Sequence, residues 1–336
     1  MDPSPSTPDA PIPKLGWIGL GSMGQAMALN LQTHLSHTNS PPLHIYNRTA
    51  ARGQPLLAIG AISSSSIQAL LQAVDICFIA VSDSNAVTSI INTILEVPAA
   101  DLHQKIIVDT STIAPGTSAW AQGCLRERGA SFVAAPVFGA SPIAKEGKLL
   151  VILAGADKAV KAVEPFLVGV LARKTLYLGE DAAKASLLKT TGNFLTAGFM
   201  ELIAEAHVFA EKTGLGSDAL ESLVEHQYGP LPFAMSKRLT GGFYLPKRDE
   251  RPWSDLNLAV KDVGLGVECA EKVGTRLPVA DLVLSHLEEA RRYGEVNGRA
   301  LDSSSMYGVL RERAGLGFES EVVRRRDGGD GGLSGL

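Results

Sequence analysis

The sequence predicts an α/β fold, in which an N-terminal domain built on a parallel sheet is followed by an all-α C-terminal domain. Over the first half of the chain, short apolar runs of strand length alternate with segments of helical spacing. This alternation is typical of a parallel sheet with helices on both faces. From about Asp181 the strand-like runs stop and helical spacing continues alone. The length of 336 residues suits two domains.

The expected strands of the first domain are apolar runs bounded by polar or helical segments. They are Leu15–Ile18, Leu43–Tyr46, Ala73–Val81, Lys105–Asp109, Ser131–Val137 and Leu149–Ala154. A helix over Met23–Leu35 joins the first two strands, which makes a βαβ unit. The second domain is expected to open with a long helix over residues 181–214, because the apolar spacing stays helical up to a glycine. A turn-rich connection over Gly241–Arg251 then leads to helices over Trp253–Val273 and Pro278–Tyr293.

Composition divides the chain into four segments. Residues 1–13 are rich in proline and lack the apolar or arginine-rich run of a targeting peptide, so we expect a disordered leader. Residues 14–178 are the predicted Rossmann domain, and residues 179–318 are the predicted helical domain, which begins with the long helix. Residues 319–336 end in a charged, glycine-rich run, and we expect a mobile tail there.

The overall charge and the cysteines narrow the class of protein. A formal net charge of −4 gives no broad attraction to nucleic acid or to anionic lipid, and no apolar run is long enough for a membrane span. The three cysteines are far apart and form no C-x-x-C pair, which fits a reducing compartment. We therefore expect a cytoplasmic protein with no nucleic-acid or membrane partner. The histidines do not fall at metal-ligand spacings, so no metal is predicted.

A glycine motif follows the first strand. The stretch KLGWIGLGSMGQAM contains G-x-G-x-x-G between the expected strand and the expected helix. In that context the glycines allow a tight turn and a close approach of the backbone to a pyrophosphate, whereas a plain structural turn is the alternative. The predicted cofactor-binding residues here are Gly19, Leu20, Gly21, Ser22, Met23 and Gly24.

The end of the second strand indicates which dinucleotide is bound. An acidic residue there would bond to the adenosine ribose and repel a 2′-phosphate. This chain has Asn47, Arg48 and Thr49 instead. An amide, a guanidinium and a hydroxyl suit a phosphate dianion, so the sequence favours NADP(H) over NAD(H), with a solvated turn as the alternative.

Candidate catalytic residues lie on the long helix. Lys189 and Asn193 are four residues apart and share a helix face. Leu187, Leu188, Phe194 and Leu195 surround them with apolar groups, which would lower the pKa of the lysine and allow proton exchange near neutrality. Ser111 and Thr112 follow an expected strand end, where their hydroxyls could hold a ligand or cap the next helix.

Four motifs in order resemble the β-hydroxyacid dehydrogenase family, which includes 3-hydroxyisobutyrate dehydrogenase and the glyoxylate/succinic semialdehyde reductases. They are GWIGLGSMGQAMALNL, Asp109-Thr110-Ser111-Thr112-Ile113-Ala114-Pro115, Ala135-Pro136-Val137-Phe138-Gly139-Ala140 with Gly147 following, and Lys189 and Asn193 together with Lys261-Asp262. The resemblance runs from about Lys14 to about Arg313. It implies hydride transfer between NADP(H) and a small-molecule carbonyl acid or hydroxyacid, in a cleft between the two domains.

The resemblance also implies residue roles. Lys189 would be the acid/base, and Asn193 would orient it and the substrate oxygen. The implied cofactor contacts further include Val81, Ser82, Thr112 and Lys261. The implied substrate contacts are Ser111, Thr112, Phe138, Gly139, Ala140, Lys189, Asn193 and Asp262. The helical domains of relatives intertwine, which implies a homodimer or a larger homo-oligomer.

Two departures from the family pattern leave alternatives open. Phe138 stands where the family usually has a serine that grips the substrate carboxylate, and the family's usual phenylalanine upstream of Lys261 falls on Ser254, beside Trp253. An imine reductase or reductive aminase shares this fold and has a more apolar pocket, but it usually lacks the lysine. The second alternative is a non-catalytic nucleotide-binding assembly protein. Retention of Lys189 favours the hydroxyacid chemistry.

Overall fold

The structure is a computed structural model, and it describes residues 12–328. The chain divides into two compact units, and the division falls between Lys189 and Thr190. The expected leader, residues 1–13, lies outside the described residues except for Ile12 and Pro13.

The first unit is built on a six-stranded parallel sheet with the strand order β3-β2-β1-β4-β5-β6. Its strands are β1 (Leu15–Ile18), β2 (His44–Tyr46), β3 (Ile62–Ser63), β4 (Ile76–Ile79), β5 (Ile106–Asp109) and β6 (Ser131–Ala134). This order is that of a doubly wound Rossmann domain, so the predicted fold class is confirmed. The sequence did not predict β3, which has two exposed residues and no apolar run to mark it.

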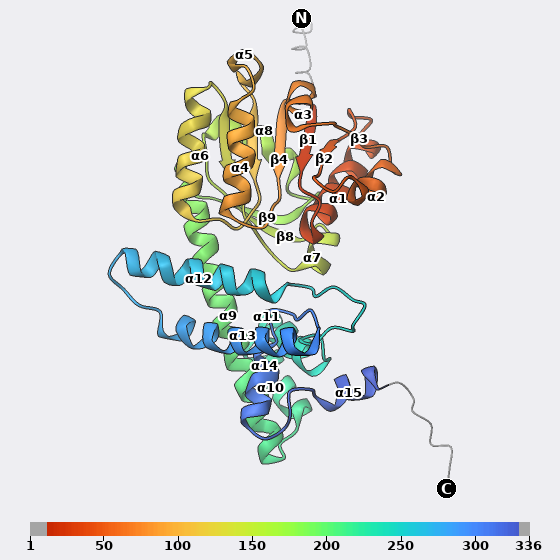
Figure 1. Cartoon of the computed structure of the whole chain (residues 1–336), viewed down its shortest axis with the longest axis vertical. Helices are drawn as coiled ribbons and strands as arrows, with labels where there is room; N and C mark the ends of the chain where they lie inside the picture. Colours follow the sequence, from red (N-terminus) through yellow and green to blue (C-terminus); the bar gives the residue numbers. More distant parts are fainter. Residues whose placement is uncertain (1–11, 329–336) are drawn as a thin grey trace, which may run out of the picture. The chain divides into compact units, whose positions relative to one another are not determined.

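Helices cover both faces of this sheet. They are α1 (Ser22–His37), η1 (Ala50–Gly53), α2 (Gln54–Leu57), α3 (Ile67–Ala73), α4 (Ser84–Leu95), α5 (Ala99–Leu102), α6 (Pro115–Glu127), α7 (Ser141–Lys145), α8 (Asp157–Val163), η2 (Glu164–Phe166) and the start of α9 (Ala182–Thr213). Because side chains alternate along a strand, Trp17 and Phe78 pack into one core with α1 and α8, while Cys77 and Ile107 pack into another with α4 and α6. Figure 1 shows α4 and α6 side by side on one of these faces.

A second, three-stranded sheet belongs to the same unit. It contains β7 (Val137–Phe138), β8 (Leu149–Leu153) and β9 (Ala172–Tyr177), with β7 antiparallel and β9 parallel to β8. The prediction of one strand over Ser131–Val137 is therefore wrong, since the run breaks before Pro136, which has no N–H to donate to a ladder. The sequence did not predict β9, because its charged, exposed residues Arg173 and Lys174 hide the strand pattern.

The second unit is all helical, as predicted. After the rest of α9 come α10 (Ser217–Tyr228), α11 (Pro230–Thr240), α12 (Leu256–Lys272), α13 (Pro278–Asn297), α14 (Met306–Arg313) and α15 (Glu321–Asp327). Its core includes Leu239, Tyr244, Val283 and Leu287, all of which are fully buried. Over residues 12–328, no helix has both the length and the apolar character needed to cross a membrane.

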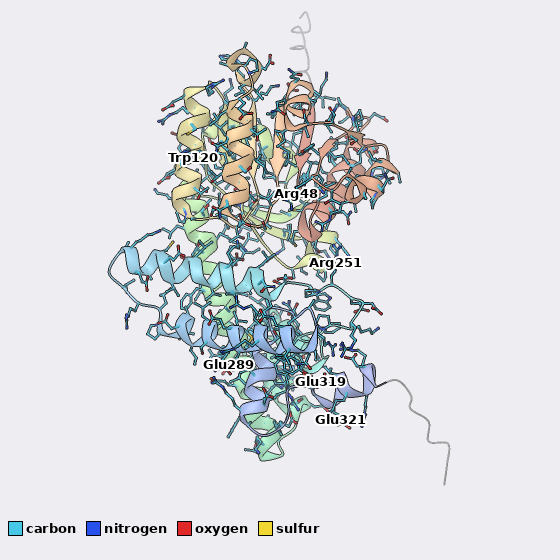
Figure 2. The ribbon with its side chains drawn as sticks, in the orientation of Figure 1. Arg48, Trp120, Arg251, Glu289, Glu319 and Glu321 are labelled. Atoms are coloured by element: carbon cyan, nitrogen blue, oxygen red, sulfur yellow. The ribbon has the colours of Figure 1, made fainter. Side chains whose placement is uncertain are left out.

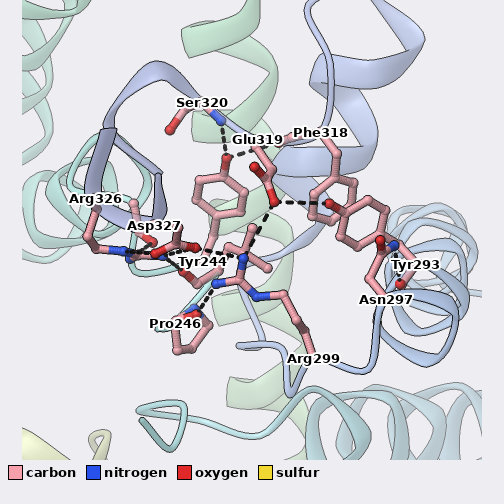
Figure 3. Close-up of polar contacts among 12 residues, drawn as sticks. Tyr244, Pro246, Tyr293, Asn297, Arg299, Phe318, Glu319, Ser320, Arg326 and Asp327 are labelled. Carbon is pink, nitrogen blue, oxygen red and sulfur yellow. Dashed lines mark hydrogen bonds and ion pairs between the residues drawn. The ribbon is translucent and has the colours of Figure 1, made fainter. Parts of the chain in front are cut away.

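The expected mobile tail, residues 319–336, is wrong in its first part. Residues 320–328 form and flank α15, in which Val323 is fully buried. The guanidinium of Arg299 pairs with the carboxylates of Glu319 at 3.4 Å and of Asp327 at 2.7 Å, and the Tyr244 hydroxyl accepts a bond from the backbone N–H of Ser320 (Figure 3). A buried arginine therefore fastens a segment whose composition alone indicates disorder. Residues 329–336 lie outside the described part of the chain.

Candidate active site

The candidate site begins at the carboxyl edge of the parallel sheet, where β1, β2, β4 and β5 end. The strand order reverses between β1 and β4, and ligands of open α/β sheets bind outside the strand ends at this point. The glycine motif, the Asn47 turn, Val81 and Ser111 all follow these strands directly. The fold thus gathers predicted cofactor residues that are far apart in sequence.

The three motif glycines meet three different requirements. A Cβ at Gly19 would lie 2.3 Å from the carbonyl oxygen of Ala80, and Gly19 has a φ of +95°, which favours glycine. A Cβ at Gly24 would lie 2.2 Å from the carbonyl oxygen of Gly19, so only glycine lets α1 pack this close to the turn. A Cβ at Gly21 would meet nothing within 4 Å. Gly19 and Gly24 shape the turn, and Gly21 leaves its outer side open.

This turn fits a pyrophosphate. Gly21 is the N-cap of α1, and no side chain caps the helix there. The first backbone N–H groups of α1 therefore point out of a 16-residue helix whose dipole favours an anion. Gly21 leaves the space in front of these N–H groups open, since a Cβ there would meet nothing within 4 Å, so the residues present fit a dinucleotide.

Asn47 ties the glycine turn to the end of β2. Its side-chain carbonyl accepts a bond of 2.8 Å from the Leu20 backbone N–H, and its amide donates one of 2.8 Å to the Thr49 carbonyl. The side chains of Arg48, which is labelled in Figure 2, and of Thr49 are exposed beside it. Asn47 therefore orders the loop, and the exposed guanidinium and hydroxyl next to it are available to a ligand.

The ends of β4 and β5 are joined by the Ser111 hydroxyl. It accepts a bond of 3.0 Å from the Val81 backbone N–H, and Ser111 is buried. The Asp109 carboxylate in turn accepts a bond of 3.0 Å from the Ser111 backbone N–H. Ser82 donates at 2.6 Å to Asp83, while Thr112 is half-buried. The structure thus brings Val81 and Ser111 together and directs the Ser82 hydroxyl to its neighbour.

Lys189 and Phe138 meet within the first unit. Lys189 is buried at 8% exposure, and its Nζ lies 4.2 Å from the centroid of the Phe138 ring. This distance is that of a cation–π contact. The start of α9 is anchored to α6, since the hydroxyls of Ser186 and Ser118 lie 2.7 Å apart and Gln122 donates to the carbonyl of Glu180. The lysine is therefore held on a fixed helix against an aromatic face.

The flanking leucines of Lys189 differ from the expectation of an apolar shell. Leu188 packs against a core of the first unit, but Leu187 is 48% exposed. In the second unit Phe194 packs against that unit's core, whereas Leu195 is 50% exposed. The apolar surroundings of Lys189 thus come from Leu188 and Phe138 rather than from all of its sequence neighbours.

In the second unit, the predicted site residues Asn193, Lys261 and Asp262 contact one another. The Asn193 amide donates to the Asp262 carboxylate at 2.9 Å, and the Lys261 ammonium lies 2.7 Å from the other oxygen of that carboxylate. Asp262 therefore holds both neighbours, and a pair that could have been solvated on a helix surface is about three-quarters buried. Trp253 stacks on Phe243 with ring centroids 4.2 Å apart, while the Ser254 backbone N–H donates to Asp302.

Sequence reasoning missed the residues that support the site. The hydroxyls of Ser141 and Ser22 lie 2.8 Å apart, so the start of α7 is joined to the start of α1. The sequence motif that contains Asp109 predicted no role for this residue, and Gln122 lies in no motif. A buried aspartate at a strand end was a usable signal, whereas the contacts of Ser141 and Gln122 span more than fifty residues and leave no local pattern.

The buried Cys77 of the first unit is not a second reactive group. Burial raises the pKa of the Cys77 thiol well above its ordinary value, so this cysteine stays protonated. Over residues 12–328, no group of three His, Cys, Asp or Glu side chains is arranged to hold a metal ion.

Comparisons with known proteins agree with this description. The model of the NAD binding domain of 6-phosphogluconate dehydrogenase matches residues 14–179, and the model described as NAD-binding of NADP-dependent 3-hydroxyisobutyrate dehydrogenase matches residues 183–310. The NADH-dependent oxidoreductase ucdB of Aspergillus ustus is 32% identical over 303 residues, which are 89% of this chain and 99% of the relative. The 2-hydroxy-3-oxopropionate reductase of Escherichia coli (strain K12) is 30% identical over 266 residues, 79% of this chain and 87% of that protein.

A solved structure, Psf3 in complex with NADP+ and 2-OPP, superposes with a TM-score of 0.74 at 25% identity and covers 88% of this chain and 99% of its own. Both halves of the chain thus match the same group of enzymes, and the glycine turn fits the dinucleotide that these enzymes use. The chain belongs to the family of NAD(P)-dependent oxidoreductases that includes 3-hydroxyisobutyrate dehydrogenase.

Proposed function

We propose that this protein is an NADP(H)-dependent reductase that interconverts a carbonyl acid, a semialdehyde or keto acid, and the corresponding hydroxyacid, with Lys189 as the general acid/base. The observation that carries the proposal is the placement of Lys189. Burying a lysine side chain on an anchored helix costs free energy, and such a residue is therefore typical of a functional site.

Residues of the first unit are proposed to donate the proton and to bind the substrate and the nicotinamide during reduction. When bound, the nicotinamide ring supplies the hydride that reaches the carbonyl carbon. Lys189 donates its proton to the carbonyl oxygen as negative charge develops there, so that the C=O bond becomes C–H and O–H. The backbone N–H groups of Gly139 and Ala140 and the hydroxyls of Ser111 and Thr112 are the proposed contacts for the carboxylate and the nicotinamide amide. In the oxidation direction the neutral amine of Lys189 removes the hydroxyl proton.

In the second unit, Asn193 and Lys261 are proposed to act as a pair held by Asp262. The carboxylate accepts from the Asn193 amide, which orients the side-chain carbonyl of Asn193 as an acceptor for substrate or lysine. The Lys261 ammonium, paired with Asp262, offers a positive charge to a cofactor or substrate anion. Asp262 is thus a positioning residue for both.

The coenzyme is proposed to be NADP(H). The support is the exposed Arg48 and Thr49 beside the ordered Asn47 turn, with no carboxylate at the place where NAD-binding domains carry one. The relative in Aspergillus ustus is NADH-dependent by its name, so the choice depends on the residues of this chain and not on the family.

Two alternatives are weaker on the same observations. An imine reductase would share the fold and would gain from the aromatic Phe138, but a buried lysine with an acid/base role suits an oxyanion rather than an iminium ion. A non-catalytic assembly protein would have no use for a buried ammonium at this position. We also propose a cytoplasmic location, which the three free cysteines support; imaging of a tagged chain would test it.

The reaction is tested by incubating the purified protein with NADPH and a panel of carbonyl acids and following the loss of absorbance at the reduced-nicotinamide band. The panel contains glyoxylate, succinic semialdehyde, aliphatic and aromatic keto acids, and a ketone-plus-amine mixture. Turnover of at least one carbonyl acid is expected. Turnover of the imine mixture alone would overturn the proposal in favour of the imine reductase.

The role of Lys189 is tested with Lys189→Ala. Loss of a general acid is expected to lower kcat by about two to four orders of magnitude. NADPH binding, measured by fluorescence titration, should stay within about twofold. The matched control is Lys184→Ala, because Lys184 is an exposed lysine on the same helix. Activity that survives Lys189→Ala would refute the proton-transfer role.

The protein is further proposed to form a homodimer. The support is a row of large apolar side chains that α9 leaves exposed in the second unit. They are Leu195, Phe199, Leu202 and Phe209, with exposed fractions of 45% to 68%. Their spacing places them on one helix face, and a soluble monomer seldom exposes such a continuous apolar row.

A further inference from the structure

The feature that carries an inference beyond this function is Phe138, the departure in the substrate loop. It ends the short strand β7, where it pairs in antiparallel register with Leu150 of β8. The next residue, Gly139, has a φ of +129°, and a Cβ there would lie 2.7 Å from Leu149. The strand pairing and the glycine therefore fix the backbone on both sides of the aromatic ring.

The ring of Phe138 faces the proposed proton donor. The Lys189 Nζ stands 4.2 Å from the ring centroid, which requires that the ammonium lies over the face of the ring and not beside its edge. Phe138 is half-buried, so part of the ring stays open to a ligand. Ile143, whose side chain lies beside Gly139, is 39% exposed and adds apolar surface to the same loop.

This contact constrains what binds next to Lys189. A carbonyl oxygen that takes the lysine proton must come within about 3 Å of Nζ. The groups attached to that carbonyl then lie beside the Phe138 ring. The face of an aromatic ring is negative and offers no hydrogen bond, so it favours apolar groups and disfavours hydroxyls and carboxylates, which would lose water without gaining a partner.

We propose that Phe138 is a specificity-determining residue, which makes this site prefer carbonyl acids with an aromatic or branched apolar side chain over small polar ones. The inference rests on the proposed reductase function and on Lys189 as its proton donor. A serine at this position would have favoured small, polar acids by donating a hydrogen bond. The phenylalanine replaces that donor by an apolar wall and also favours the ammonium form of Lys189, which is the form that reduction consumes.

The test compares the ratio of kcat/KM for phenylpyruvate to kcat/KM for glyoxylate in three proteins. The wild type is expected to prefer phenylpyruvate. Phe138→Ser is expected to lower the ratio by at least about tenfold, because the apolar contact is lost and a donor is restored. Phe138→Leu, the matched variant, keeps an apolar wall without a ring and should change the ratio by no more than about threefold.

The pH profile of kcat distinguishes the apolar contact of Phe138 with the substrate from its cation–π contact with Lys189. With Phe138→Leu the ammonium form loses the cation–π contact, so the upper limb of the kcat profile for reduction should move to lower pH. Phe138→Ser should show a similar move. A profile that stays in place in both variants would refute the contribution of the ring to Lys189.

The two proposals fail in different ways. If the wild type reduces no carbonyl acid, the function fails, and calorimetric binding of phenylpyruvate and glyoxylate to the Lys189→Ala protein still reports the preference of the site. If the wild type reduces carbonyl acids but prefers glyoxylate, or if Phe138→Ser leaves the ratio unchanged, the function stands and the inference about Phe138 is wrong. If Phe138→Ser does not fold, the preference of the wild type between phenylpyruvate and glyoxylate tests the inference by itself.

Discussion

Arg48 is the residue on which the proposed coenzyme preference depends. Its guanidinium is exposed at the end of β2, next to a turn that Asn47 holds in place. A guanidinium binds a phosphate dianion through charge-assisted hydrogen bonds, whereas a ribose hydroxyl gains little from it. The preference for NADPH over NADH should therefore be lost when this one side chain is removed.

Arg48→Ala is expected to lower kcat/KM for NADPH by about tenfold to a hundredfold, which corresponds to the loss of hydrogen bonds to a charged group. The value for NADH should change by no more than about threefold. Arg126→Ala, which removes an exposed arginine from α6, is the control and should leave both values unchanged. Equal efficiency of the wild type with NADPH and NADH would contradict the prediction at once.

At this scale, the sequence predicted the residues whose roles are local. The glycines lie within a short stretch between a strand and a helix, where spacing and context together indicate their steric role. The role of Arg48 stays a prediction. The bond from the Leu20 backbone N–H to Asn47 and the contact of Phe138 with Lys189 were not predicted. Both join positions that are distant in sequence, and only the folded chain brings them together.

The C-terminal helix α15 shows how an element can depend on one buried ion. Arg299 is almost fully buried and pairs with Glu319, which precedes α15, and with Asp327, the last residue of α15. The Arg326 bond and the Arg299 pairing hold the pKa of Asp327 below its ordinary value of 3.8. The carboxylate thus contributes stability above that value, and the contribution is lost as the pH falls through the lowered pKa.

Arg299→Met is expected to release α15 and to lower the free energy of unfolding of the second unit by about 2 kcal/mol, since it takes the guanidinium away from Glu319 and leaves Asp327 with its Arg326 pairing alone. Hydrogen exchange over residues 319–328 and chemical denaturation measure the two effects. Arg325→Met is the control on the same helix, because Arg325 is 78% exposed. In the wild type, the hydrogen-exchange protection of α15 should also fall below about pH 4. Protection that persists in Arg299→Met would show that the ion pairs do not hold the helix.

The elements were predictable where apolar periodicity is strong. The long helix, expected over residues 181–214, is observed as α9 (Ala182–Thr213), and β1 matches residue for residue. The strand β9 was missed because Arg173 and Lys174 interrupt its apolar pattern, and the helix α15 was missed because charged residues dominate its sequence. Their stability comes from pairing with β8 and from Arg299, which no local propensity reports.

At the scale of the whole molecule, the second unit presents an apolar surface that its described residues leave uncovered. The α9 row of Leu195, Phe199, Leu202 and Phe209 would be costly to expose to water in a monomer, at roughly 25 cal/mol for each Å² of apolar surface. A second copy of the chain is the occupant that the proposed homodimer requires. The predicted assembly thus explains a surface that a stable monomer would avoid.

The double variant Leu202→Asp, Phe209→Asp is expected to halve the mass of the protein in solution, measured by light scattering after size exclusion. Its circular dichroism should be unchanged, since both side chains are exposed in the single chain. Val296→Asp, at an 86% exposed position outside the row, is the control and should leave the mass at that of the wild type. A wild type with the mass of one chain would contradict the homodimer.

The Asn47 side chain has a consequence for anyone who would re-engineer the coenzyme. Because its two hydrogen bonds already fix the glycine turn and the end of β2 in the free protein, the loop gives up little conformational entropy when a dinucleotide arrives. A library that aims to exchange NADPH for NADH should therefore vary the exposed positions Arg48 and Thr49. It should leave Asn47 unchanged, since its loss would weaken the preorganised loop for both coenzymes alike.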